Sequence, residues 1–273
     1  MKKLDYSKVE KHIVEWLKEY AKNAKVEGFV IGISGGVDSA VTSTLAAKTG
    51  LKLYTIQMPI KQKSEEVNRA TSHVYWLVEN FPNVFPLTCD LTNTFNSFLS
   101  EIEKSENKEG QNMAEANTRS RLRMVTLYYH ASIKKCLVLG TGNKVEDFGV
   151  GFYTKYGDGG VDLSPIADLM KSEVRELGRH MCILKELSEA IATDGLWDDS
   201  MTDEKQLGAS YDDLEWAMEW IANNPLGFNF STDQFDALPK RQANAVSIYK
   251  KRFFANQHKM EPIPVCNLSE LKK

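Results

Sequence analysis

The sequence lacks several features that would assign it to whole classes of protein. No apolar run approaches the roughly 18–20 residues that a membrane-spanning helix needs. The charged start "MKKLDYSKVEKH" is not followed by the apolar stretch of a signal peptide. The four cysteines stand apart, without a C-x-x-C pair or the His/Cys spacing of a metal site. These absences predict a reduced, soluble, cytoplasmic protein with no membrane partner.

An excess of basic residues is also missing, since the net charge is −3. A general nucleic-acid binder normally carries a broadly basic surface that neutralises phosphates. We therefore expect no nucleic-acid partner. Any anionic ligand would have to be met locally, by a few placed cations and by backbone amides.

What the chain does contain is an alternation of short apolar runs with helical segments. The runs show no polar alternation, as expected for strands buried on both faces of a parallel sheet, and they lie at 28–34, 51–59, 83–90 and 136–143. The pattern predicts an α/β fold: a doubly wound, Rossmann-like parallel sheet of about five strands, with helices on both faces. Helical patterns resume after residue 170, so we expect one domain over 1–273 with a helical C-terminal part.

The stretch "GISGGVDSA" follows the first apolar run and reads as strand, glycine turn and helix. Gly35 and Gly36 allow a tight turn close to an anion, and a helix N-terminus adds free amides. Asp38 would repel a phosphate unless it holds a hard cation such as Mg²⁺. The alternative is that Asp38 only caps its helix. Taken alone, the loop leaves both interpretations open.

The fourth apolar run is followed by the same arrangement. In "VLGTGNKVED", Thr141 corresponds to Ser34, and Glu146 follows it at nearly the distance at which Asp38 follows Ser34. Glu146 could simply be a solvated glutamate in a first helical turn. Because two separate segments end in a carboxylate at the same edge of the sheet, we favour a shared Mg²⁺ site.

A third segment, "FYTKYGDGG", is rich in glycine and contains Lys155. It reads either as a lid over a charged ligand or as an ordinary surface loop. Lys171 begins the next helix, where a cation opposes the helix dipole, which indicates an anion nearby or exposure to solvent.

The run "TRSRLRM" does not form one basic patch. On a helix Arg119 and Arg123 share a face, and Glu115 is spaced to pair with them on the surface. Arg121 points the other way and is the candidate ligand contact.

These motifs together resemble a known family. "SGGVDS" resembles the pyrophosphate loop of the N-type ATP pyrophosphatases, and "GTGNKVEDFGVGFYTKYGDGGVDLSPI" is similar to the NAD synthetase family. The similarity extends from about residue 10 to "NQHKMEPIP" near the end. The resemblance implies a homodimer that uses ATP, Mg²⁺ and ammonia to convert deamido-NAD to NAD through an adenylate, releasing AMP and pyrophosphate.

The resemblance also implies roles for individual residues. The catalytic ones are Asp38, Lys171 and Thr193, and the Mg²⁺ ligands are Asp38 and Glu146. Contacts to ATP fall on Gly32, Ile33, Ser34, Gly35, Gly36, Val37, Asp38, Ser39, Thr141, Lys171 and Thr193. Contacts to deamido-NAD fall on Arg121, Lys155, Asp162, His258 and Lys259.

The sequence departs from the family at two places. Gln57 stands where many relatives have an arginine that meets the adenine, and Thr193 lies in "ATDGLWDD" rather than Pro-Thr-Ala-Asp. The alternatives are another AMP-forming amidotransferase or tRNA adenylase with the same loop, and a nucleotide-binding regulator without catalysis. The chain lacks an amidase domain, so we expect free ammonia as the nitrogen source unless a separate subunit supplies it.

Overall fold

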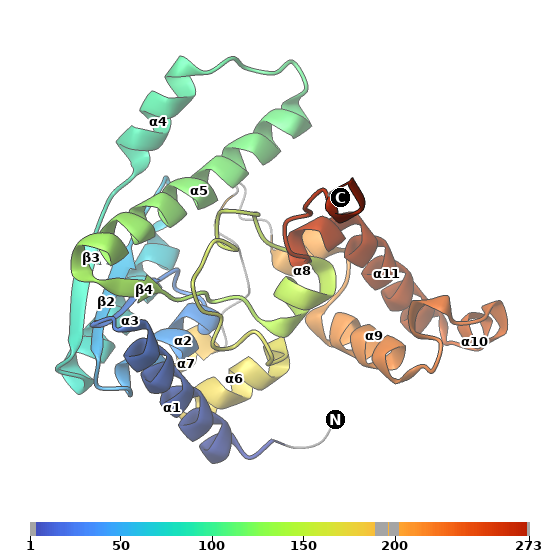
Figure 1. Cartoon of the computed structure of the whole chain (residues 1–273), viewed down its shortest axis with the longest axis horizontal. Coiled ribbons are helices and arrows are strands. Elements are labelled where there is room, and N and C mark those ends of the chain that lie inside the picture. The colour runs from blue at the N-terminus through green and yellow to red at the C-terminus, as the bar shows by residue number, and fades with distance from the viewer. Residues whose placement is uncertain (1–3, 189–195, 197–201, 272–273) are drawn as a thin grey trace.

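The computed structural model describes residues 4–188, 196 and 202–271, and strands and helices alternate through the first half of the chain (Figure 1). The strands are β1 (Gly28–Gly32), β2 (Lys52–Gln57), β3 (Val84–Thr88) and β4 (Cys136–Val138). The helices around them are α1 (Tyr6–Ala24), α2 (Val37–Ala47), α3 (Ser64–Asn80), α4 (Thr92–Glu101), α5 (Lys108–Lys134), α6 (Lys171–His180) and α7 (Lys185–Ser188). The C-terminal helices are α8 (Asp203–Leu207), α9 (Tyr211–Asn223), α10 (Thr232–Asp236) and α11 (Lys240–Met260). A π-helix, η1 (Val145–Val150), follows β4, and η2 (Gly227–Asn229) and η3 (Ser269–Leu271) are short 3₁₀ helices.

The sheet is parallel, with strand order β3-β2-β1-β4. The chain builds outward from β1 to β3 and then returns to add β4 on the other side of β1. The carboxyl ends of β1 and β4 therefore flank the switch point, where ligands bind in open α/β sheets. The predicted doubly wound sheet is confirmed. Within the described residues it has four strands rather than about five, and beyond β4 pairing is reduced to one parallel bridge between Leu139 and Leu163.

Both faces of the sheet are covered along β1, which explains its unbroken apolar run, whereas the edge strand β3 is mostly exposed, against the expectation for its run. Along β1, Phe29 and Ile31 point into a core formed with α1, α2, α3 and α6, whereas Val30 points into a second core beneath α5. All three side chains are fully buried. Side chains of β1 that point alternately to the two faces of the sheet thus all enter an apolar core, so none of these positions is polar.

The C-terminal helices pack on one another and on η1 rather than on the sheet, and Figure 1 shows them to one side of it. Val145 and Val150 of η1 are fully buried in this third cluster, together with side chains of α9 and α11. The segment that follows β4 therefore joins the sheet to the helical part. In the described part of the chain, no helix is both long and apolar enough to cross a membrane.

Candidate active site

The loop after β1 is folded back on itself by its own hydroxyl groups. The Ser34 amide donates to Ser39 Oγ at 3.3 Å, and Ser39 Oγ donates to the Gly36 carbonyl at 3.1 Å. Gly35 has φ +84°, and a Cβ at this position would lie 2.6 Å from the Glu66 carbonyl oxygen of α3. Glycine is therefore required here, because the turn is left-handed and packs directly against a helix backbone. The turn directs the amides at the start of α2 into a cavity, as phosphate loops do.

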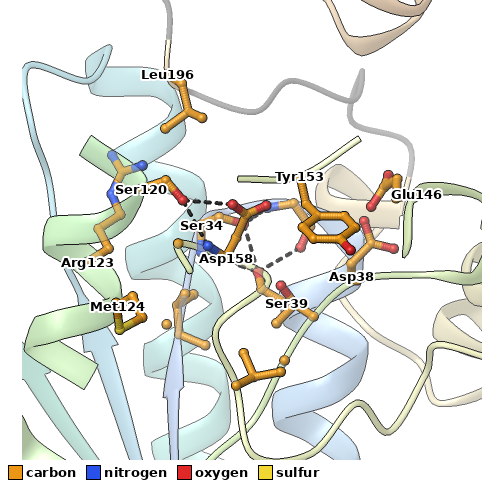
Figure 2. A pocket seen from close by; sticks show the side chains of 18 of the residues that line it. Ser34, Asp38, Ser39, Ser120, Arg123, Met124, Glu146, Tyr153, Asp158 and Leu196 are labelled. Carbon is orange, nitrogen blue, oxygen red and sulfur yellow. Dashed lines mark hydrogen bonds between the residues drawn. The ribbon is translucent and has the colours of Figure 1, made fainter. Parts of the chain in front are cut away.

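The loop after β4 reaches the same cavity from the neighbouring strand. Asn143, which is fully buried, accepts hydrogen bonds from the amides of Val145 and Glu146 at 3.1 and 3.2 Å and so starts η1. Thr141 lines the cavity just before this cap. The cap turns the Glu146 side chain toward the start of α2, where Asp38 lies (Figure 2).

Lys171 joins the two carboxylates. Its Nζ donates to Asp38 Oδ2 at 2.5 Å and to Glu146 Oε1 at 3.1 Å, and the residue is 3% exposed. Burial opposes a charge on Lys171, but the two carboxylates outweigh it and raise the pKa of the ammonium group above its ordinary value. Lys171 is therefore charged at neutral pH, and the predicted anion near the start of α6 is a pair of carboxylates.

Tyr211 completes this cluster from the C-terminal helices. Its hydroxyl donates to Glu146 Oε1 at 2.5 Å and lies 3.2 Å from Asp203 Oδ2, while Lys171 Nζ lies 4.8 Å from the centre of its ring. Burial, Glu146 and Asp203 all raise the pKa of the Tyr211 phenol. The hydroxyl therefore keeps its proton and remains a donor.

The cavity that these groups surround has a volume of about 240 Å³. Its charged lining residues are Asp38, Glu66, Glu146, Asp147, Asp158, Asp203, Arg69, Arg123 and Lys171. Burial, with help from Glu146, raises the pKa of Asp147 to about 8, so this group is neutral at pH 7. Burial also raises the pKa of Asp38 and of Asp158, and the only cations of the lining are Arg69, Arg123 and Lys171 among the described residues. A polyphosphate in this cavity would need an additional cation to balance its charge.

Asp38 and Glu146 fit a magnesium ion. Asp38 Oδ1 is buried and has no hydrogen-bond partner among the described residues, while its Oδ2 binds Lys171. Glu146 likewise uses Oε1 for Lys171 and Tyr211. Each carboxylate therefore keeps one oxygen for a cation. Among the described residues no group of three or more acidic, His or Cys side chains could hold a metal alone, so phosphates and water would complete the shell, as Mg²⁺ prefers.

Comparison with known proteins places this site in a family. The NAD synthase family model matches residues 9–262. The chain belongs to the NAD synthase family. It is 34% identical over 269 residues to the NH(3)-dependent NAD(+) synthetase of Methanosarcina acetivorans, which covers 97% of this chain and 100% of that protein. Identity to the enzyme of the same name from Mesoplasma florum is 40% over 205 residues, covering 75% of this chain and 81% of that protein.

Solved structures agree with this assignment. The NMN synthetase of Francisella tularensis superposes with a TM-score of 0.79 at 27% identity, covering 97% of this chain and 100% of that one. The NH3-dependent NAD synthetase of Campylobacter jejuni gives a TM-score of 0.75 at 22% identity, with the same coverage, and supports the fold alone.

The structure brings four of the five residues predicted to bind the second substrate of this family into one group. Arg121 Nη2 donates to the Lys155 carbonyl at 3.3 Å, and Lys155 Nζ donates to the His258 carbonyl at 2.5 Å. Lys259 Nζ donates to the carbonyls of Gly151 and Tyr153, both at 2.8 Å. We call Arg121, Lys155, His258 and Lys259 the basic group. It adjoins the cavity through Tyr153, which lines it.

Asp162, the fifth residue of that prediction, lies apart from the basic group. Its carboxylate accepts from the Tyr128 hydroxyl at 3.1 Å and from the Val138 amide at 2.8 Å. It thereby fastens the segment after the glycine-rich loop to β4 and α5. Thr193, predicted as an ATP contact, lies outside the described residues.

The expectation that Arg119 lies on the surface is wrong. Arg119 is 5% exposed, its guanidinium lies 4.7 Å from the centre of the Phe95 ring, and its Nη1 donates to the Leu196 carbonyl at 2.7 Å. Arg123 lines the cavity and donates to the Met58 carbonyl at 3.2 Å. Helical spacing predicts correctly that both arginines share one face of α5. This face is not on the surface, because Arg119 packs against Phe95 of α4 and Arg123 lines the cavity.

Sequence reasoning missed Tyr211, Asp203 and Arg69 as parts of the site. The apolar residues of "YDDLEWAMEW" pack in the C-terminal cluster, and their helical spacing predicts no role beyond that for this segment. The available signal for Tyr211 was its place directly after the Ser210 cap, at the first residue of α9. Arg69 lines the cavity and donates from Nε to the Gly35 carbonyl at 3.3 Å, and no motif marked it.

Proposed function

We propose that the protein is an ammonia-dependent NAD synthetase, which amidates deamido-NAD to NAD in the last step of NAD biosynthesis. ATP is cleaved to AMP and pyrophosphate. The observation that carries the proposal is the pair of carboxylates, Asp38 and Glu146, held by Lys171 at the end of the glycine loop. The family assignment over residues 9–262 supports the substrate class.

The chemistry runs in two displacements. A carboxylate oxygen of nicotinate attacks the α-phosphorus of ATP, and the bond to the β-phosphate oxygen breaks with release of pyrophosphate. Ammonia then attacks the acyl carbon, loses a proton, and expels AMP. The first step forms an activated acyl adenylate, and the second transfers its acyl group to ammonia. The protein therefore needs to position the reacting groups and balance charge rather than supply a nucleophile.

The chain's own residues have distinct parts in this scheme. The amides and hydroxyls of residues 32–39 would receive the departing β- and γ-phosphates, and Thr141 would contact ATP from the neighbouring strand. Lys171 would offer its ammonium to the same phosphates, while Asp38 and Glu146 hold Mg²⁺. When bound, Mg²⁺ supplies positive charge that offsets the negative charge of the phosphates. Thr193 is proposed as a further catalytic contact.

The basic group is proposed as the site for deamido-NAD. Its members offer ammonium and guanidinium donors suited to a pyrophosphate and a carboxylate. Asp162 is proposed to contact deamido-NAD from the β4 side of the glycine-rich loop. Burial lowers the pKa of Lys259, and an anionic substrate beside it would raise this pKa again.

We further propose that the enzyme is a single domain that works as a homodimer in the cytoplasm. The exposed face of α5 carries Val125, Tyr129 and Ile133 at intervals of four residues, with 58%, 64% and 57% of their surfaces accessible. A contiguous apolar stripe on a long helix fits the self-complementary face of a two-fold dimer. The four cysteines are free thiols, as expected in a reducing compartment.

One assay tests the proposal. The protein is incubated with ATP, Mg²⁺, ammonium and deamido-NAD, and NAD, AMP and pyrophosphate are measured. We expect all three in equal amounts. Formation of ADP in place of AMP, or formation of AMP only after tRNA is added to the mixture, would contradict the proposal. Glutamine replaces ammonium in a second arm and should not support the reaction. Because one structural neighbour is named NMN synthetase, a third arm offers nicotinate mononucleotide, which should react more slowly than deamido-NAD.

A further inference from the structure

Tyr211 occupies an unusual position for a tyrosine, because its hydroxyl donates a hydrogen bond to Glu146, a carboxylate of the proposed magnesium site. The side chain is 1% exposed and lies among the C-terminal helices, yet its hydroxyl is 2.5 Å from Glu146 Oε1. A phenol has one proton to donate, and the shorter of its two contacts assigns that proton to Glu146 rather than to Asp203 at 3.2 Å. The hydrogen bond is buried and charge-assisted, and such bonds are strong.

The ring of Tyr211 fixes the second member of the site. Lys171 Nζ lies 4.8 Å from the ring centre, in the range of a cation–π contact. Lys171 in turn donates to Asp38 and Glu146. One side chain therefore contacts Glu146 through its hydroxyl and Lys171 through its face.

The backbone around this contact is built to hold it. Val145 precedes Glu146 and Met170 precedes Lys171, and both pack in the same buried cluster as Tyr211. One turn further along α9, Glu215 accepts from the Ser172 amide at 2.9 Å and from Ser172 Oγ at 2.6 Å. The first turns of α9 thus fix η1 and the start of α6 from one side.

We propose that Tyr211 is a positioning residue, which holds Oε1 of Glu146 so that the remaining carboxylate oxygen is set for Mg²⁺ bound together with ATP. The inference rests on the proposed Mg²⁺ role of Asp38 and Glu146. Partners of this kind orient metal ligands without touching the metal, and their loss typically lowers metal affinity about 10- to 100-fold.

The test is Tyr211→Phe, which keeps the ring, its burial and its contact with Lys171 while removing the hydroxyl. The matched control is Tyr249→Phe, because Tyr249 is 4% exposed in the same cluster and its hydroxyl makes no hydrogen bond with the described residues. Calorimetry measures the affinity for a non-hydrolysable ATP analogue with Mg²⁺ and, separately, with EDTA.

We expect Tyr211→Phe to weaken binding about tenfold or more with Mg²⁺ and to leave binding in EDTA unchanged, with Tyr249→Phe like the wild type in both. The Mg²⁺ concentration that gives half-maximal NAD formation should rise by the same factor. An equal loss with and without metal, an equal loss in the control, or no change would overturn the inference.

If Tyr211→Phe does not fold, the wild-type protein labelled with 3-fluorotyrosine gives the same decision. The fluorine resonance of Tyr211 should shift when Mg²⁺ is added to the complex with the ATP analogue, and that of Tyr249 should not. A Tyr211 resonance that does not respond to Mg²⁺ would overturn the inference. Both measurements use ATP and metal alone, so they stand even if the assay with deamido-NAD yields no NAD, which would contradict only the proposed function.

Discussion

At the scale of single residues, two glycines with similar backbone angles carry different consequences. Gly35 and Gly50 have φ values of +84° and +74°. A side chain at Gly50 would meet nothing within 4 Å, whereas a Cβ at Gly35 would lie 2.6 Å from the Glu66 carbonyl. Position 50 needs glycine for its dihedral angle alone, and position 35 needs it for the close approach of α3 as well.

Gly35→Ala should therefore weaken ATP binding, and Gly50→Ala should not. The shared left-handed backbone costs about 1–2 kcal/mol of stability in either variant, which urea denaturation measures. At Gly35 the loop must also move away from α3, so calorimetry should show ATP affinity reduced more than tenfold, a magnitude we estimate from backbone strain of roughly 1–3 kcal/mol. Equal ATP affinities in the two variants would show that the loop does not bind phosphate.

Asp38→Asn should keep the fold and lose turnover. Asparagine has the same shape and can still accept a hydrogen bond from Lys171, but it removes one of the two charges proposed for Mg²⁺. We expect kcat to fall by about a hundredfold or more, with a thermal midpoint near that of the wild type. Asp168→Asn is the control, since Asp168 is 97% exposed and pairs only with Lys144 among the described residues. Near-normal activity of Asp38→Asn would remove the metal role.

At the scale of elements, α2 and α3 meet at a buried histidine. His73 is fully buried, and its Nε2 lies 2.9 Å from Ser43 Oγ. Burial lowers the pKa of His73 to about 4, well under its usual value near 6.5. The imidazole is therefore neutral in the folded protein and takes up a proton on unfolding at mildly acidic pH.

The contribution of His73 to stability should consequently fall as the pH is lowered from 6.5 toward 4. In this window the unfolded imidazole binds a proton that the folded one does not, so this contribution to the free energy of unfolding rises with pH, whereas the raised pKa of Asp147 contributes in the opposite direction. His73 contributes up to about 3 kcal/mol to this slope. Urea denaturation at pH 7 and pH 4.5 should show a smaller difference for His73→Gln than for the wild type, and an unchanged difference for the exposed control His12→Gln. A slope that His73→Gln leaves intact would contradict this assignment.

The elements that the sequence predicted well are those whose burial leaves a local signal. The apolar runs of β1, β2 and β4 became well-buried strands, whereas β3 is an edge strand on which Phe85, Pro86 and Thr88 are exposed. The glycine loop lies at the end of β1 because its motif is local. Arg119 was misplaced because helical spacing identifies a shared face but not what covers it. Tyr211 was missed because its partner, Glu146, is 65 residues away and belongs to another element.

At the scale of the whole molecule, the apolar stripe of α5 makes the proposed dimer testable. Tyr129→Glu places a charge in the middle of the stripe, where burial against a second copy would be unfavourable. Light scattering should give a dimeric mass for the wild type and a monomeric mass for this variant. Tyr75→Glu changes an equally exposed tyrosine on α3, and it should remain dimeric. A monomeric wild type at micromolar concentration would contradict the dimer.

The basic group has a consequence for the heat of substrate binding. Lys155 and Lys259 already donate to backbone carbonyls of residues 151, 153 and 258, so their side chains are ordered before any ligand arrives. An anion that reaches them exchanges one acceptor for a stronger one and has little side-chain entropy to remove. Binding at this group should therefore be driven by enthalpy, with a small change in heat capacity, because few apolar atoms leave water.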